Sequence, residues 1–364
     1  MLFFFERAIE KYNILATSNL NCNSKTIMVK KLMLFIGLSS LSAFSQIGGD
    51  YSYQFLNLPS SPVQASLGGK NITIRDNNVN HSFVNPAAIN SKMSNQLALN
   101  FSKYYGAITY GSAAYVKSFD NEKNVFFGVN YVNYGDIEGY DEFGNETGIF
   151  SGNEVALNVG YSYNISQTNW YFGANTKFIG SYLESYSSVG VALDLGVLNV
   201  NEENNLTFAF TIRNLGAQIS TYTDVREKLP LDIMLAVSKK LDNVPLRWHI
   251  GLDNLQKWNL SFSNPNRSET DLEGVVKEED ITFFNNAIRH LVFGVELFPE
   301  RNFNIRLGYN FRKGEELRVI EQRHFSGITA GFGFKVNRMR FEYSYSRQTI
   351  AANTSLFGLS IDLK

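Results

Sequence analysis

The stretch 155–164, which reads V-A-L-N-V-G-Y-S-Y-N, constrains the fold of this chain more than any other. Side chains alternate between the two faces of a β-strand. One face of this stretch is therefore apolar, with tyrosines at one end, and the other is small or polar. About 10 residues is the length that a tilted strand needs to cross a bilayer. If the pattern recurs, the chain forms a transmembrane β-barrel.

The same alternation recurs from Gln96 to the C-terminus. A hydrophobic content of 44% and a net charge of −1 are unremarkable for a membrane protein of this kind, because alternation keeps apolar residues from forming long runs. We predict an all-β fold, a transmembrane antiparallel barrel of about 14 strands, an even number as in single-chain outer-membrane barrels. The alternating segments are 96–102, 107–118, 124–134, 155–164, 170–178, 189–195, 206–213, 231–238, 246–253, 291–297, 304–311, 328–335, 339–345 and 357–363.

Charged residues identify the face that lines the interior. A Lys or Arg on the lipid-facing side near the midplane costs about 2–4 kcal/mol. Several of them there would exceed a typical total stability of about 5–15 kcal/mol. The face that carries them is therefore the lumen, and the net charge gives no reason to expect a nucleic-acid partner. The charges on this face include Asp194, Arg213, Asp232, Arg247, Glu296, Arg306 and Glu342.

The connections between the segments alternate in length, as periplasmic turns and extracellular loops do. The alternative, a soluble β-sandwich, has no reason to keep this order and would expose Lys and Glu where this chain has Gly and Ala. The short connections are 120–123, 166–169, 201–204, 242–245, 299–302 and 337–338, and the longer ones are 135–150, 215–228, 255–289, 312–325 and 347–353.

The N-terminus carries an export signal. Two lysines precede an apolar run over 32–41, and Ala43-Phe44-Ser45 ends it with small residues. We expect residues 28–45 to be a signal peptide. Translation would then begin at Met28, and residues 1–27, an N-terminal extension, would not belong to the protein. A membrane anchor, the alternative, would need a longer apolar run. The one cysteine, Cys22, precedes the cleavage site, so the mature chain would have no thiol for a disulfide or a metal.

Residues 46–95 do not alternate and are rich in turn and cap residues. Irregular backbone cannot face lipid. We therefore expect a hatch, placed in the lumen or at the periplasmic mouth of a barrel formed by residues 96–364. A flexible linker is the alternative. The residues that would fold the hatch are Gly68, Gly69, Asn85, Pro86 and Ala87.

Signals for catalysis, metals or cofactors are weak. The four histidines lie far apart, and neither H-E-x-x-H nor G-x-S-x-G occurs. The Gly-Gly at 68–69 lacks the Lys-Ser/Thr of a phosphate loop. We expect a non-enzymatic protein with no cofactor, in which the carboxylates of Asp194 and Glu296 pair with Arg213, Arg247 and Arg306.

The longest connection, 255–289, is the main candidate for a partner-binding surface, with 135–150 as the second. Loops longer than about 12–15 residues are uncommon unless they are functional or disordered. Aromatic residues on an exposed loop favour a partner surface, and plain mobility around the acidic stretch 271–280 is the alternative. The aromatic candidates are Trp258, Phe262, Phe283 and Phe284.

Several short segments resemble the PorQ family of the type IX secretion system. The Asn-Pro-Ala that follows a glycine-rich segment is also similar to PorV and to the fatty-acid channel superfamily. One difference is the end of the chain, Leu363-Lys364, because many outer-membrane barrels end in an aromatic residue. The segments that carry the resemblance are Tyr53-Gln54-Phe55-Leu56-Asn57-Leu58-Pro59-Ser60-Ser61, Leu67-Gly68-Gly69, Asn85-Pro86-Ala87, Asp141-Glu142-Phe143-Gly144-Asn145-Glu146, Leu183-Glu184-Ser185-Tyr186 and Asn254-Leu255-Gln256-Lys257-Trp258.

This resemblance implies an outer-membrane component with an N-terminal hatch that anchors a PorZ-like surface protein, beside PorU-like and PorV-like proteins. Such a component would assist the delivery or attachment of secreted cargo. The alternative, implied by the fatty-acid channels, is an outer-membrane transporter for hydrophobic small molecules such as fatty acids. The charged lumen predicted above disfavours that alternative.

Overall fold

The computed structural model describes residues 51–104, 106–119, 123–165, 168–260, 269–270, 276–277, 282–316, 326–347 and 353–363. The expected N-terminal extension and signal peptide lie outside these ranges.

Within these residues, fourteen strands close into one antiparallel barrel, so the predicted fold is confirmed. Closure is made by the first and last strands, which pair from Gln96 opposite Asp362 to Lys103 opposite Ser355. The short strands β10 (Glu269–Thr270) and β11 (Val276–Lys277) form a separate ladder. The barrel strands are β1 (Gln96–Lys103), β2 (Thr109–Ser118), β3 (Asn124–Tyr140), β4 (Glu146–Asn164), β5 (Trp170–Leu183), β6 (Tyr186–Asn201), β7 (Leu206–Ser220), β8 (Asp232–Lys240), β9 (Leu246–Leu252), β12 (Leu291–Leu297), β13 (Phe303–Asn310), β14 (Ile328–Val336), β15 (Met339–Arg347) and β16 (Asn353–Asp362).

The two faces of the sheet differ as the alternation predicts. Outward side chains such as Phe208 and Phe332 are 51% and 40% exposed, whereas the inward Asn158 and Asp194 are buried. An apolar outer face on a closed barrel is the arrangement of a protein that spans a bilayer with strands. In the described part of the chain, no helix combines the length and the apolar character needed to cross a membrane.

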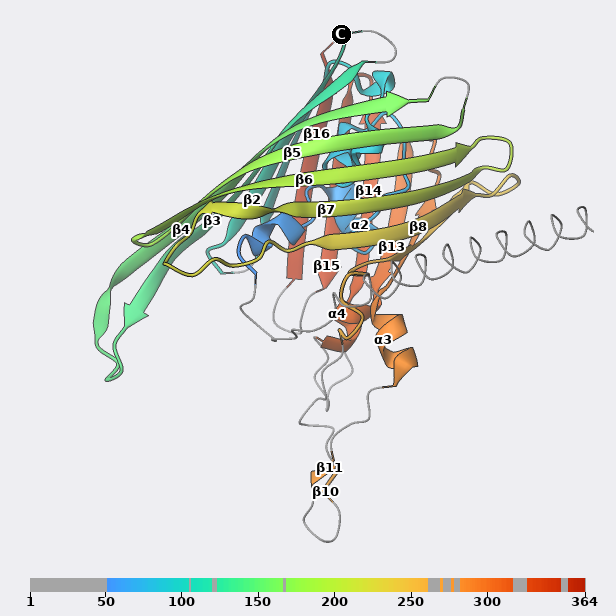
Figure 1. Cartoon of the computed structure of the whole chain (residues 1–364). Helices are drawn as coiled ribbons and strands as arrows, with labels where there is room; N and C mark the ends of the chain where they lie inside the picture. Colours follow the sequence, from blue (N-terminus) through green and yellow to red (C-terminus); the bar gives the residue numbers. More distant parts are fainter. Residues whose placement is uncertain are drawn as a thin grey trace, which may run out of the picture. The chain divides into compact units, whose positions relative to one another are not determined.

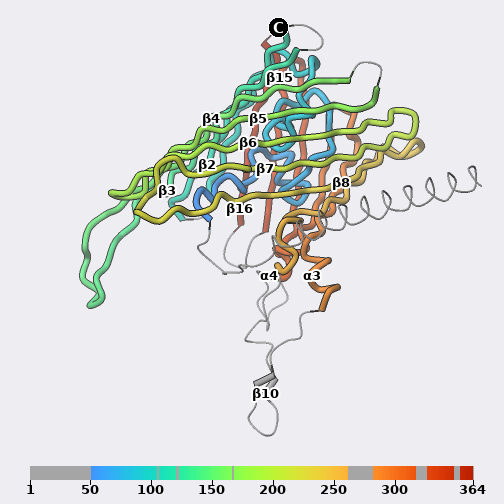
Figure 2. Tube along the Cα trace, in the orientation of Figure 1, coloured from blue at the N-terminus to red at the C-terminus, as the bar shows by residue number. Residues whose placement is uncertain are grey.

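Residues 51–95 form a hatch that fills the interior of the barrel (Figures 1 and 2). Glycines on the inner face of the wall allow the hatch backbone to come close. A Cβ on Gly173 of β5 would lie 2.2 Å from the carbonyl carbon of Pro86, and one on Gly196 of β6 would lie 2.1 Å from Asn85 Oδ1. The hatch therefore occupies the lumen. Its helices are η1 (Gln54–Asn57), α2 (Pro62–Ser66), η2 (Val79–Phe83), η3 (Pro86–Ala88) and η4 (Ser91–Met93).

The two ends of the barrel differ in their connections. One end, called here the short-turn end, has the brief connections 119–123, 165–169, 202–205, 241–245, 298–302 and 337–338. The other, called here the loop end, carries the brief connections 104–108, 141–145, 184–185 and 348–352 and also the long ones 221–231, 253–290 and 311–327. The last two of these hold α3 (Phe283–Arg289) and α4 (Phe311–Glu316).

Two expected loops are in large part strands. β3 and β4 extend through 135–150 to a tight turn at 141–145, and β7 continues to Ser220. The expectation was wrong because both faces of these extensions are open to solvent over much of their length. Polar and apolar residues there no longer need to alternate.

Candidate ligand cavity at the loop end

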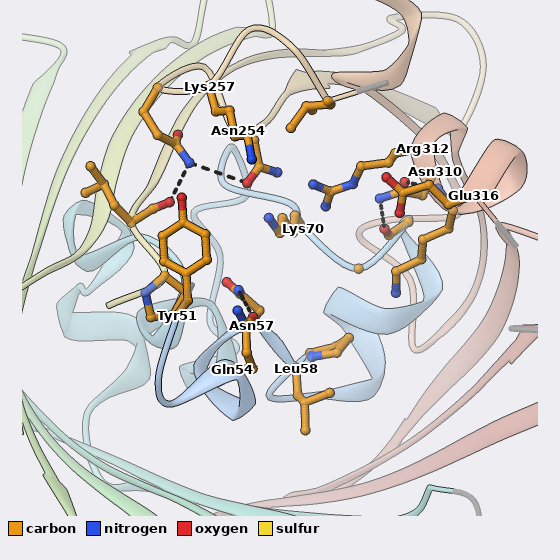
Figure 3. A pocket seen from close by; sticks show the side chains of 18 of the residues that line it. Tyr51, Gln54, Asn57, Leu58, Lys70, Asn254, Lys257, Asn310, Arg312 and Glu316 are labelled. Atoms are coloured by element: carbon orange, nitrogen blue, oxygen red, sulfur yellow. Dashed lines mark hydrogen bonds between the residues drawn. The ribbon is translucent and has the colours of Figure 1, made fainter. Parts of the chain in front are cut away.

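A cavity of about 390 Å³ lies between the start of the hatch and the connections of the loop end. Its walls mix apolar and polar side chains. Figure 3 shows Lys70 in the middle of the cavity, with Tyr51 on one side and Arg312 on the other. The hatch contributes Tyr51, Gln54, Asn57, Leu58, Pro59, Gly68, Gly69 and Lys70, and the wall and connections contribute Tyr104, Pro230, Leu231, Asn254, Gln256, Lys257, Leu260, Asn310, Arg312, Lys313 and Glu316.

The Gly68-Gly69 turn positions Lys70. Both glycines have a positive φ, 87° and 95°, which side chains with a Cβ rarely adopt. The Gly68 N–H donates to Thr329 Oγ1 at 3.1 Å, and Asn310 Nδ2 donates to the Gly68 carbonyl at 3.3 Å. Gly68, one of the predicted hatch glycines, thus joins the hatch to the wall by hydrogen bonds, and the turn places Lys70 in the cavity.

Lys70 is the centre of a buried ion network. Its Nζ lies 2.7 Å from Asp232 Oδ2 and 3.1 Å from Asp253 Oδ2. Arg312 approaches Asp253 at 3.5 Å, and Arg213 approaches Asp232 at 3.9 Å. Sequence reasoning missed Lys70, because hatch residues follow no period that reports which side chains face inward.

Lys313 on α4 lines the cavity without such a carboxylate. None of the described carboxylates lies within 4 Å of its Nζ, and burial lowers the pKa of Lys313 to about 8. Lys313 also lines a recess of about 20 Å³, large enough for one water molecule. The recess is lined with hydroxyls, and those of Ser344 and Thr354 are buried without a hydrogen-bond partner among the described residues. An ammonium beside free hydroxyls can bind an anionic group.

The predicted lumen charges face inward, and two of them, Asp232 and Arg213, belong to the Lys70 network beside this cavity. Away from the cavity, Glu296 accepts from Arg247 at 2.8 Å and from Arg306 at 3.1 Å, and Arg306 lies 3.1 Å from Glu342, so four of the seven meet in one cluster. Asp194 pairs with Lys177 at 2.8 Å, and not with one of the three arginines as expected. In the hatch, Asn85 Oδ1 accepts from the Ala87 N–H, with Pro86 in the first turn of η3.

Three of the four aromatic candidates of the long connection, Trp258, Phe283 and Phe284, lie in its described part. The Trp258 ring stacks on His290 at a centroid distance of 5.1 Å and packs at a tilt against Phe283 at 4.9 Å. Phe283 and Phe284 are 72% and 69% exposed. Phe262 lies outside the described residues. This group, Trp258 with Phe283 and Phe284, is called the aromatic platform below.

The barrel wall is incomplete beside the cavity. β8 pairs with β7 only as far as Arg213, whereas β7 continues to Ser220 with β6 alone. The described loop residues 226–229 lie along this free edge, and the Ser52 N–H donates to the Lys228 carbonyl at 3.0 Å. Between them is a second pocket of about 460 Å³. Its lining shares Tyr51, Leu231 and Gln256 with the cavity, so the two spaces are neighbours.

Comparison with known proteins supports the fold. No protein-family model and no curated protein matches the sequence. Among solved structures, the TodX deltaS2S3 mutant monoaromatic hydrocarbon channel superposes with a TM-score of 0.50 at 11% identity, over 83% of this chain and 99% of that one. The Ralstonia pickettii toluene transporter TbuX gives a TM-score of 0.48 at 12% identity, over 84% and 98%. A Pseudomonas aeruginosa FadL homologue gives 0.47 at 10% identity, over 84% and 98%.

The closed fourteen-stranded wall, its apolar outer face and the internal hatch define the class of this protein. It is a β-barrel of the outer membrane.

Replacement of Lys70 by methionine should destabilise the protein by about 3–5 kcal/mol, because it leaves two buried carboxylates without their common partner. Denaturant unfolding of the detergent-solubilised protein measures this. Lys240→Met is the matched control, since its partner Glu300 is largely exposed and such pairs contribute about 0–1 kcal/mol. Equal effects of the two variants would contradict a structural role for the Lys70 network.

Proposed function

We propose that this barrel takes a small amphipathic molecule with an acidic group into the loop-end cavity and releases it sideways, through the wall, into the membrane. The observation that carries the proposal is that the cavity and the gap beside β7 share Tyr51, Leu231 and Gln256. A molecule in the cavity thus lies next to a place where the strands are not paired.

The cavity lining suits a molecule with two chemically different parts. Leu58, Pro230 and Leu260 offer apolar surface, while Arg312 and Lys313 offer positive charge. A carboxylate gains roughly twice as much from a charged donor as from a neutral one. The TodX channel is a monoaromatic hydrocarbon channel, and its similar fold supports an apolar body for the ligand.

Passage straight down the lumen has less support. The spaces deeper in the hatch measure about 20 and 10 Å³, which suffices for single water molecules only. The second pocket, beside the free edge of β7 and called the wall pocket from here on, measures about 460 Å³, which is within the range of small-molecule sites. Transport of hydrophobic molecules, the alternative named above, therefore has more support than the charged lumen indicated, because the route avoids the cluster of Arg247, Glu296 and Arg306.

Binding of a carboxylate should depend on pH through Lys313. Its ammonium is present below a pKa of about 8 and is lost above it, and a bound anion shifts this midpoint upward. Between pH 7 and pH 10 the affinity for a fluorescent dodecanoate should fall about tenfold, since a charge-assisted hydrogen bond contributes about 1.5–3 kcal/mol. In Lys313→Gln the affinity should be low and flat over this range. The same pH dependence in that variant, or for the uncharged alcohol, would exclude Lys313 as the anion-binding group.

Filling the wall pocket should separate binding from release. Ala217 is exposed on the free part of β7 and lines the pocket, so Ala217→Trp should leave the dissociation constant unchanged. Transfer of the bound probe into the bilayer of proteoliposomes should slow about tenfold, a barrier increase of about 1.4 kcal/mol. Leu157→Trp, on the lipid-facing side of β4, is the control and should release at the wild-type rate. Unchanged release from Ala217→Trp would rule out the sideways route.

A second candidate function is favoured by the aromatic platform. Large exposed aromatic side chains near a barrel mouth are typical of protein-binding surfaces. They support the scaffold implied by the PorQ resemblance, in which the barrel anchors a PorZ-like surface protein of the type IX machinery, beside PorU-like and PorV-like proteins, and assists cargo attachment.

The double variant Phe283→Ser/Phe284→Ser should reduce capture of such a surface protein at least about tenfold. The reason is that truncating a central interface aromatic often costs about 2 kcal/mol of binding free energy. Pull-down from gently solubilised outer membranes, quantified by mass spectrometry, measures this. Phe119→Ser at the short-turn end is the control, since Phe119 is equally exposed. If both variants capture the protein at the wild-type level, the platform is not its binding site.

A further inference from the structure

Beyond the barrel wall, β3 and β4 continue as a two-stranded ribbon over residues 135–151, which projects away from the neighbouring strands (Figures 1 and 2). β2 pairs with β3 only as far as Asn133, and β5 pairs with β4 only from Gly152. Both outer edges of the ribbon therefore lack a strand partner among the described residues. Free edges of this kind are templates for the addition of another strand.

The side chains place the ribbon in water. Ser151 continues the outward-facing row of Val155 and Leu157 on β4. Asp136 pairs with Ser151 and Glu138 pairs with Ile149, so these two carboxylates point to the face that meets lipid lower in the barrel. Carboxylates there would be unfavourable within the hydrocarbon. The membrane boundary consequently lies below the ribbon.

The ribbon combines exposed apolar side chains with unbalanced negative charge. Ile137, Tyr140, Phe143 and Ile149 are 51%, 54%, 81% and 71% exposed. Residues 135–153 include no lysine, arginine or histidine, although the whole chain is nearly neutral. The ribbon carboxylates are those of Asp136, Glu138, Asp141, Glu142 and Glu146.

Hydrogen bonds within the turn of the ribbon stabilise the ionised form of Asp141. Asp141 Oδ1 accepts from the backbone N–H groups of Phe143 and Asn145 at 2.9 and 2.8 Å, and the Asn145 side chain donates to Oδ2 at 2.9 Å. Hydrogen bonds to the ionised form, those from Asn145 first, lower the pKa of Asp141. The ribbon tip is therefore ordered and anionic at neutral pH.

We propose that this ribbon binds an extended, basic segment of a partner protein by strand addition. The inference rests on the second function proposed above, the anchoring of a surface protein, and adds where that protein is held and by what chemistry. The free edge supplies backbone hydrogen bonds. Alternate Lys or Arg side chains of the segment would meet Asp136 and Glu138 on one face, and the residues between them would pack on Ile137 on the other face.

The test uses the whole protein in lipid nanodiscs and two labelled peptides, one of alternating lysine and valine and one of alternating glutamate and valine. The ribbon variant is Asp136→Asn/Glu138→Gln/Glu142→Gln/Glu146→Gln, which spares the turn-forming Asp141. The matched control neutralises four exposed carboxylates at the short-turn end: Glu202→Gln/Glu203→Gln/Asp242→Asn/Glu300→Gln.

Fluorescence anisotropy should show that the lysine peptide binds the wild type and the control equally, and the ribbon variant about tenfold or more weakly. The glutamate peptide should not bind. Hydrogen exchange should show protection of ribbon amides when the lysine peptide is bound. Equal binding of both peptides, an equal loss in the control variant, or an absence of protection would overturn the proposal.

The strand-binding site and the anchoring function can be disproved separately. If Phe283→Ser/Phe284→Ser abolishes capture of the surface protein while the ribbon binds no basic peptide, anchoring stands and strand addition is wrong. If the basic peptide binds the ribbon but no surface protein is captured from the membrane, the strand-binding site stands without the anchoring function.

Discussion

The structure depends on the requirement that no backbone polar group faces hydrocarbon unpaired. The ladder between β1 and β16 meets it by closing the sheet, which leaves no edge in the membrane. Closure with fourteen strands has a second consequence. A barrel of about 8 strands is filled by its own side chains, and a wider one encloses space. The hatch, residues 51–95, fills that space, and its irregular backbone is shielded from lipid by the wall.

The contact between hatch and wall combines close approach with buried polar bonds. A Cβ on Gly308 would lie 2.3 Å from the Gly68 nitrogen, and one on Gly331 would lie 2.6 Å from Ser66 Cβ. Gly173 and Gly196 allow the same close approach beside η3. Such contacts fix position, while Lys70 with its two aspartates fixes orientation, since a displaced hatch would leave buried charges unpaired. The small residues on the inner face, read in the sequence as lumen-facing, are thus the surface on which the hatch is packed.

The sequence was sufficient for the barrel because burial on one face imposes a period of two. Runs such as 155–164 and 328–335 are strands with the predicted face outward. The same reasoning could not find the ribbon, because neither of its faces is buried. It also could not predict that the β7–β8 ladder ends at Arg213, because a period of two shows which face a residue is on but not which residue it pairs with. For the cavity, Gly68 and Gly69 were recognisable as turn residues, but Lys70 and Lys313 lie in segments without a period and are brought together only by the fold.

The free edge of β7 is a local exception to the closure requirement, and its position is informative. It is covered by hydrogen bonds that a small motion can break: Asn214 Nδ2 to the Pro230 carbonyl, Gln256 to the Leu231 carbonyl and Ser52 to the Lys228 carbonyl. Each such bond contributes about 0.5–1.5 kcal/mol. Moving the hatch would instead separate the buried Lys70 network, at about 3–5 kcal/mol for a broken pair. The sideways route proposed above would break these bonds and leave the Lys70 network in place, and this difference supports it over a route down the lumen.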